Sequence, residues 1–133
     1  QPEKPWAWAD FGVIGTLHIK GRNIPILSNA TGQALAFGAG RHEEVRADGP
    51  PVISGHRDTH FSVLGYMKEG DHFSYSLHGT KHDYKVVDTR IYDIREGTLL
   101  TPDTNQILLI TCWPFSGVDP NTSKRFLLLG EKL

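Results

Sequence analysis

The sequence predicts an all-β domain that closes into an eight-stranded barrel. Eight prolines and fourteen glycines in 133 residues indicate many turns. Short runs rich in Val, Ile, Thr and aromatic residues lie between these turns, as is typical of strands. Helical spacing of apolar residues is confined to short stretches, so we expect only one or two short helices. About eight short strands with so little helix favour a closed β-barrel, which leaves no exposed strand edges.

The length and charge of the chain limit its organisation and its partners. A chain of 133 residues holds one modest core, and we divide it into an N-terminal arm, residues 1–10, and a barrel domain, residues 11–133. Trp6 and Trp8 are expected to pack the arm against this domain. The net charge of −1, with Lys and Arg scattered rather than striped, argues against nucleic acid as a partner.

The first half of the chain is expected to form three short strands. They are Val13–Ile19, Ile24–Ser28 and Val52–Ser54. A turn at Gly21–Asn23 joins the first two. Asn29–Gly40, rich in glycine and alanine, is expected to be a loop with a short helical piece. A polar, acidic connection follows it and ends at Pro50-Pro51, where the third strand starts.

A short helix is expected immediately after the third strand, over Asp58–Tyr66. Phe61, Leu64 and Tyr66 lie near helical spacing, and the Asp58 side chain is able to cap the first turn. The helix would therefore begin beside His56.

The second half is expected to supply a hairpin and two more strands. The hairpin arms are Asp71–Leu77 and Asp83–Ile94, and the two later strands are Gln106–Cys112 and Arg125–Gly130. Alternation of Tyr84, Val86 and Asp88 indicates a strand with one buried face. Gln106–Cys112 is apolar up to Thr111, which predicts burial on both faces. Loops at 97–105 and 116–123 complete this half.

The single cysteine, Cys112, is the first candidate for chemistry. It cannot form an internal disulfide, and it ends an apolar strand that would hold its sulfur rigidly. A cysteine nucleophile reacts as the thiolate, and it needs a histidine close by and a group that steadies developing charge. His56 follows a strand end, and Arg125 opens the last strand. Arginine offers donors that stay charged, suited to an oxyanion.

Other histidines are alternatives to His56 as the catalytic histidine, or could be metal ligands. We prefer His56 to His60 because Gly55 before it permits close backbone approach, and because a strand end positions a side chain better than a helix face. The pairs His56/His60 and His78/His82 have zinc-like spacing, but neither is followed by further ligands at a specific spacing. We therefore expect no metal site.

Three motifs in this order resemble the sortases, the cysteine transpeptidases of bacterial cell surfaces. They are Gly55-His56, the strand Ile107–Cys112 with its terminal Thr-Cys, and the run that begins at Arg125. The resemblance extends from Val52 through Gly130. Among the sortases, the sequence most resembles a group found in Gram-negative (marine-type) proteobacteria. Trp113 departs from many relatives, which carry a smaller residue or tyrosine there, and could narrow a substrate groove.

The resemblance implies a sortase-type barrel and a transpeptidase mechanism. Cys112 would attack the Thr carbonyl of a Leu-Pro-x-Thr-Gly-like sorting signal, with His56 as general acid and then base and Arg125 at the oxyanion. Around these, we expect substrate contacts from four further residues, Thr111, Ser54, Trp113 and His60.

Partners and location follow from the same resemblance. The partners would be a secreted protein with a C-terminal sorting signal and an amine acceptor at the cell surface. The enzyme would be exported, acting in the periplasm or at the outer side of the inner membrane. Because the chain starts at Gln1 without Met, we expect a membrane anchor that is absent from it.

No cofactor is expected. The acidic residues Glu43, Glu44 and Asp48 resemble a calcium-binding loop of some sortases, but such runs are more often solvated.

Two alternatives stay open at this point. A cysteine peptidase that only hydrolyses would share the acyl-enzyme, so sequence does not separate it from a transpeptidase. A non-catalytic β-barrel that binds an extended peptide at a sheet edge would need neither Cys112 nor His56.

Overall fold

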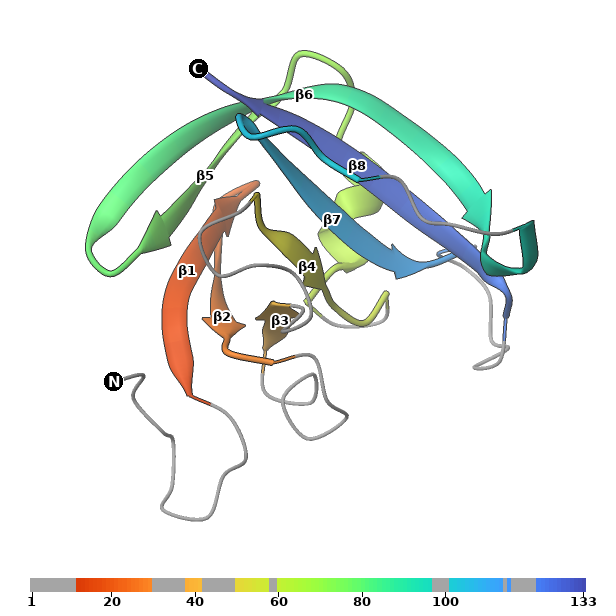
Figure 1. Cartoon of the computed structure of the whole chain (residues 1–133), viewed down its shortest axis with the longest axis horizontal. Helices are drawn as coiled ribbons and strands as arrows, with labels where there is room; N and C mark the ends of the chain where they lie inside the picture. Colours follow the sequence, from red (N-terminus) through yellow and green to blue (C-terminus); the bar gives the residue numbers. More distant parts are fainter. Residues whose placement is uncertain are drawn as a thin grey trace.

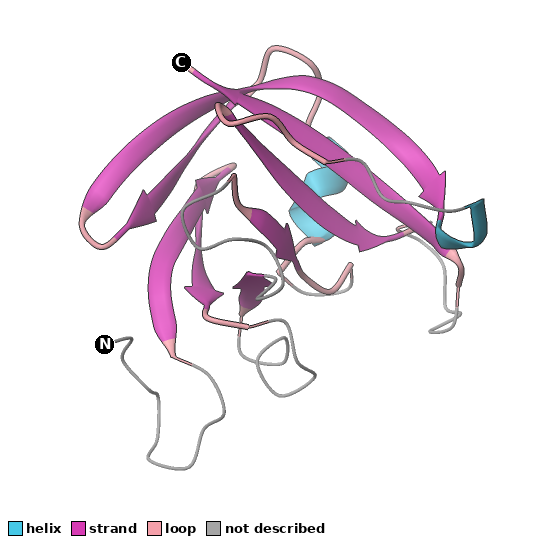
Figure 2. Ribbon diagram, viewed as in Figure 1, coloured by secondary structure: helices cyan, strands magenta, loops and turns pink. Residues whose placement is uncertain are grey.

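Eight strands and two short 3₁₀ helices make up the part of the chain that the structure describes (Figures 1 and 2). This computed structural model describes residues 12–29, 38–41, 50–57, 60–96, 101–113, 115 and 122–133. The strands are β1 Val13–Ile19, β2 Arg22–Leu27, β3 Ala39–Arg41, β4 Val52–Ser54, β5 His72–Leu77, β6 Thr80–Asp93, β7 Gln106–Cys112 and β8 Lys124–Lys132. The helices are η1 Ser62–Tyr66 and η2 Ile94–Glu96. The arm and the acidic stretch at Glu43, Glu44 and Asp48 lie outside the described residues.

The strands close into a barrel in the order β1-β2-β3-β4-β7-β8-β6-β5, and β5 pairs back onto β1. This confirms the expected all-β, eight-stranded barrel. Most neighbours are antiparallel, but β2 with β3 and β4 with β7 are parallel. Parallel strands cannot be joined by a tight turn and require a long crossover. In agreement, 51 residues, 55–105, lie between the end of β4 and the start of β7.

Two tight turns differ from the expected ones by a few residues. The β1–β2 turn consists of Lys20 and Gly21, and the β5–β6 turn of His78 and Gly79; all four residues have positive φ. Two-residue hairpin turns with positive φ at both positions match the twist of the flanking strands. The turn expected at Gly21–Asn23 was therefore too long, and β6 begins at Thr80 rather than at the expected Asp83.

Two further expectations need correction. The end of the stretch expected as a loop, Asn29–Gly40, forms the short strand β3, held by β2 and β4. The helix expected over Asp58–Tyr66 is a 3₁₀ helix limited to Ser62–Tyr66, preceded by Phe61 with no side-chain cap. Asp58 lies outside the described residues. Val63 and Leu64 are its buried residues, and a five-residue connector of this kind is commonly a 3₁₀ helix.

Strand β7 is buried on both faces, as its sequence predicted. Ile107 and Leu109 belong to the barrel core, whereas Leu108 and Ile110 belong to a second apolar cluster on the outside of the sheet. Side chains of a strand alternate between the two faces. The face of Leu108 and Ile110 therefore continues to Cys112, and the core face continues to Thr111.

Candidate active site

The candidate site lies at the rim where β4 and β7 both end. The two strands are parallel, with Ser54 level with Ile110. The ladder continues one residue past β4, because the Gly55 amide donates to the Ile110 carbonyl at 3.1 Å. The Thr111 hydroxyl then donates to the Gly55 carbonyl at 2.8 Å. These two bonds fix the chain that leads into His56 and set His56 beside the end of β7, where Cys112 lies.

Strand β8 brings Arg125 to the same rim. In the antiparallel β7–β8 pair, Cys112 is directly opposite Arg125 and Ile110 is opposite Leu127. Directly opposed residues point to the same face of a sheet, about 4.5–5.5 Å apart at Cβ. Since Ile110 and Leu127 share the outer apolar cluster, Cys112 and Arg125 face outward with them.

The Cys112 thiol is free and half-buried. His56 is exposed, and Arg125 is half-buried. The arrangement therefore combines a half-buried thiol and a half-buried guanidinium on one face of the sheet with an exposed imidazole at the same rim.

The guanidinium of Arg125 is oriented by the chain just before β8. Its Nη1 donates to the carbonyl of Thr122 at 2.7 Å and to that of Lys124 at 3.0 Å. Arginine carries five N–H donors in a fixed plane. Anchoring through Nη1 fixes that plane, so the remaining donors keep a defined direction.

Thr122 is a positioning residue that the sequence analysis missed. Its hydroxyl donates to the Trp113 carbonyl at 3.0 Å, and the Trp113 amide donates to the Lys124 carbonyl at 3.0 Å. Together these bonds extend the β7–β8 ladder one step past Cys112. The signal available in the sequence was a Thr-Ser pair before the Lys-Arg that opens the strand, a pattern that favours local side-chain to backbone bonds.

His60 lies close enough to His56 for their charges to interact. Burial, and then the positive charge of His56, lower the pKa of His60 from its ordinary value of 6.5. The Nδ1 atom of His60 is buried without a hydrogen-bond partner. His60 is therefore held as a neutral imidazole near neutral pH, and its surroundings disfavour a second positive charge beside His56.

The glycine before His56 is required by packing. A Cβ on Gly55 would come within 2.7 Å of the ring of Phe61, which is completely buried. The Phe61 amide in turn donates to the His56 carbonyl at 3.0 Å. The close approach expected from Gly55 is thus made by this ring, and the Phe61 amide holds the His56 carbonyl.

Aromatic rings cluster on the inward face of the sheet, where Phe126 lies opposite Thr111 and packs with Phe115 against the barrel core. Trp113 stacks on Phe126 with ring centroids 6.0 Å apart, and Phe115 meets Phe126 edge-on at 5.1 Å. Phe115 also packs on η1, where a Cβ on Gly65 would lie 3.3 Å from its ring. The residue after the cysteine is therefore anchored in a rigid aromatic cluster.

The expected substrate contacts fall into different places. Ser54 is half-buried on the outer face, level with Ile110, and Trp113 is half-buried next to the cysteine. Thr111, by contrast, is only 2% exposed and points to the interior, where it holds the Gly55 carbonyl. Its position suits orientation of the His56 segment rather than contact with a substrate.

Among the residues that the structure describes, no group of three or more His, Cys, Asp or Glu side chains could hold a metal ion. In the same residues, no helix has the length and apolar character needed to span a bilayer.

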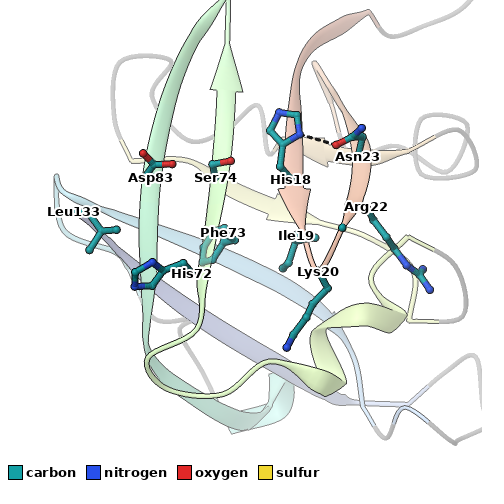
Figure 3. Close-up of a pocket in the computed structure, with 11 residues that line it drawn as sticks. His18, Ile19, Lys20, Arg22, Asn23, His72, Phe73, Ser74, Asp83 and Leu133 are labelled. Atoms are coloured by element: carbon teal, nitrogen blue, oxygen red, sulfur yellow. Dashed lines mark hydrogen bonds between the residues drawn. The ribbon is translucent and has the colours of Figure 1, made fainter.

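A shallow hollow of about 480 Å³ lies away from this rim, on the strands β1, β2, β5 and β6 (Figure 3). His18 lies within it, and both ring nitrogens are engaged: Nδ1 with Asn23 Oδ1 at 2.7 Å and Nε2 with Ser76 Oγ at 3.3 Å. Lys20 pairs with Asp71 at 3.6 Å. Two of the basic side chains that line the hollow, His18 and Lys20, thus already have partners.

Comparison with known proteins gives a consistent result. A model of the sortase domain matches residues 17–133. Sortase D of Bacillus subtilis (strain 168) is 30% identical over 115 residues, which are 83% of this chain and 58% of that protein. The chain therefore spans less than two thirds of that relative's length.

Solved structures agree with the sequence match. Sortase A from Corynebacterium diphtheriae superposes with a TM-score of 0.80 at 28% identity, covering 95% of this chain and 63% of that one. Sortase C of Streptococcus pneumoniae gives a TM-score of 0.78 at 25% identity, covering 91% and 68%.

Proposed function

Because this chain belongs to the sortase family, we propose that it is a cysteine transpeptidase that uses Cys112, His56 and Arg125. The observation that carries the proposal is their convergence: the β4–β7 ladder leads His56 to the end of β7, and the β7–β8 register sets Arg125 opposite Cys112. A binding module has no need for these three groups at one rim.

In the first half-reaction the Cys112 thiolate attacks the Thr carbonyl carbon of a Leu-Pro-x-Thr-Gly-like signal. A C–S bond forms, and the carbonyl oxygen becomes an oxyanion, to which the Arg125 guanidinium donates. Collapse of this intermediate breaks the C–N bond. His56 gives its proton to the departing amine, which leaves a thioester on Cys112.

In the second half-reaction an amine attacks the thioester carbon and loses its proton to His56. The C–S bond then breaks, the thiolate is restored, and a new amide joins the signal to the acceptor. Water as the attacking group would give hydrolysis instead. The two outcomes share every residue named here and differ only in the acceptor.

The partners and location follow from this reaction. The substrate would be a secreted protein with a C-terminal sorting signal, and the acceptor an amine at the cell surface. The enzyme would act outside the cytoplasm, in the periplasm or at the outer side of the inner membrane.

Intact-protein mass spectrometry tests the proposal. The protein is mixed with a Leu-Pro-x-Thr-Gly peptide, with and without triglycine. We expect a mass increase equal to the peptide cut after Thr, located on Cys112, which disappears into a peptide–triglycine amide when the amine is present. Product as free acid in both samples would identify a hydrolase.

The control is Cys112→Ala, with its fold checked by thermal unfolding. Turnover by a folded Cys112→Ala protein would refute the assignment of the nucleophile. Absence of adduct with the first peptide calls for a library of signals. Saturable binding of an extended peptide, with no turnover in the library and no loss on Cys112→Ala, would identify a binding module.

A further inference from the structure

A second cavity, of about 280 Å³, lies at the mouth of the barrel opposite the candidate active site. Its place follows from the strand ends: Gln106 begins β7 whereas Cys112 ends it, and Lys132 ends β8 whereas Arg125 lies at its start. The polar side chains that line it and matter here are Arg41, Tyr75, His82, Tyr84, Gln106 and Lys132.

The two tyrosines reach this cavity from inside the barrel. Tyr75 pairs with Leu17 on one side and His82 on the other, and Tyr84 pairs with Phe73 and Lys132. Opposed residues share a face. Since Leu17, Phe73 and both tyrosines belong to the barrel core, these rows face the interior.

The Tyr75 hydroxyl is buried and has no hydrogen-bond partner, and the whole residue is only 3% exposed. Burying a hydroxyl without a partner is costly, and folded proteins usually avoid it. Burial raises the pKa of Tyr75, while the positive charge of Arg41 opposes that rise. The phenol is therefore protonated at neutral pH, a hydrogen-bond donor within the electrostatic reach of a guanidinium.

Among the described residues that line the cavity, Arg41 and Lys132 carry positive charge, and none is Asp or Glu. Protonated phenol, guanidinium and ammonium groups are all donors, which suits an anion with several oxygens. The volume lies just below that of common small-molecule sites, so it suits a small molecule rather than an extended peptide.

We propose that this opposite mouth of the barrel binds a small oxyanion, a carboxylate or a phosphate, between Arg41 and Lys132 with a hydrogen bond from the Tyr75 hydroxyl. The hollow of Figure 3 is a poorer candidate, although it also contains basic residues. There His18 is bonded at both nitrogens and Lys20 is paired with Asp71, whereas the Tyr75 hydroxyl has no partner. The proposal does not depend on the transpeptidase reaction.

Two probes, inorganic phosphate and succinate, test the site and distinguish the two sources of anion. Each is titrated into the ¹⁵N-labelled parent protein at constant ionic strength, and amide chemical shifts are followed. We expect saturable shifts, for at least one probe, at the amides of Arg41, Tyr75 and Gln106. Because Cys112 lies at the other mouth, its amide should move much less.

Three variants sharpen the test. Tyr75→Phe removes one oxygen and should weaken binding roughly tenfold or more, as expected for a lost hydrogen bond to a charged group. Tyr66→Phe, at a residue 75% exposed, makes the same chemical change elsewhere and should bind as the parent does. Lys132→Met, at an exposed strand end, should also weaken binding and reduce its salt dependence.

A stability readout checks the same point without labelling. The bound anion should raise the unfolding temperature of the parent and of Tyr66→Phe, and raise that of Tyr75→Phe less. Without anion, Tyr75→Phe should be as stable as the parent or more so, because no hydrogen bond is lost. The proposal is overturned if neither probe binds saturably, or if Tyr75→Phe binds as tightly as the parent.

Discussion

At Cys112 the register of β7 against β8 decides which residues act together. A slip of one residue would turn either side chain to the other face of the sheet. The pairing of Cys112 with Arg125, one step beyond the pairing of Thr111 with Phe126, excludes such a slip. Trp113 and Thr122 extend the ladder past the cysteine and hold this register at the strand end.

Arg125→Lys tests whether the shape of the guanidinium matters as well as its charge. Lysine keeps the positive charge but loses the planar set of donors that Nη1 anchors to the carbonyls of Thr122 and Lys124. We expect kcat/KM for peptide ligation to fall by about 10²–10³-fold, the range for removing a preorganised oxyanion donor, with the unfolding temperature unchanged. A lysine variant within about threefold of the parent would show that charge alone is enough.

Thr111→Val tests the buried bond that positions the His56 segment. Valine has nearly the shape of threonine, but it leaves the Gly55 carbonyl without the hydroxyl that bonds it at 2.8 Å. We expect a loss of about 1–3 kcal/mol in the free energy of unfolding, measured by urea denaturation. Activity should fall in kcat more than in KM, because a residue that is 2% exposed does not bind substrate.

Thr111→Ser is the matched control, since it keeps the hydroxyl and removes only a methyl group. It should retain most of the activity. Equal activity in the serine and valine variants would show that the Thr111 hydroxyl does not position the His56 segment.

At the scale of elements, the parallel pair β4–β7 is the feature that builds the rim. Parallel strands end at the same edge, so the residues after β4 meet the end of β7. η1 then follows, and its neighbour Phe61 packs on Gly55 and bonds the His56 carbonyl. The backbone of the His56 segment is therefore held by the extended β4–β7 ladder at Gly55 and by the Phe61 amide at the His56 carbonyl.

Gly55→Ala tests that packing. The new Cβ would lie 2.7 Å from the Phe61 ring, which is completely buried and has no room to retreat. We expect a loss of about 1–3 kcal/mol in the free energy of unfolding, typical of overpacking, together with reduced kcat as His56 shifts. Gly65→Ala is the control: its Cβ would meet Phe115 at 3.3 Å, a contact that small shifts relieve, so stability should change much less. Equal losses in the two variants would contradict a special role for Gly55.

Elements with strong local patterns were predictable from sequence, and those that depend on distant partners were not. β7 was predicted with its full bounds because its apolar run allows few other structures. β3 was missed because Ala39, Gly40 and Arg41 have little β propensity, and the strand exists through pairing with β2 and β4.

The same division applies to the candidate site. Cys112, His56 and Arg125 could be nominated from residue type and motif order. The inward turn of Thr111 depends on the register of β7 against its neighbours, which no local pattern encodes. The Thr-Ser pair at 122–123 indicated a side-chain to backbone bond, but its partner, the Trp113 carbonyl, is set by the pairing of β7 with β8.

At the scale of the whole molecule, barrel closure separates two polar regions. The outward face at the end of β7 carries Cys112 and Arg125, and the opposite mouth carries the tyrosines and cations of the second cavity. The core of aliphatic side chains between them, completely buried at Leu17, Leu109 and Leu128, keeps the barrel shape that both regions need. Variants that destabilise the barrel, such as Thr111→Val and Gly55→Ala, should therefore weaken both regions as the protein unfolds, whereas Arg125→Lys and Tyr75→Phe should each leave the other region unchanged.

Global stability should depend on pH through His60. Burial, and then the charge of His56, hold the pKa of His60 in the folded protein below 6.5, its ordinary value in an unfolded chain. Above 6.5 the imidazole is neutral in both states and contributes no pH dependence. As the pH falls below 6.5, the unfolded chain binds a proton that the folded protein resists, so the free energy of unfolding decreases until the pH passes the lower, folded pKa.

Urea denaturation of the parent and of His60→Gln, at several pH values from about 7.5 down to about 4.5, measures this contribution. The glutamine variant should lose stability less steeply than the parent over this window, whereas His72→Gln, at an exposed histidine on β5, should follow the parent. Parallel curves for all three proteins would show that the surroundings of His60 do not resist its protonation.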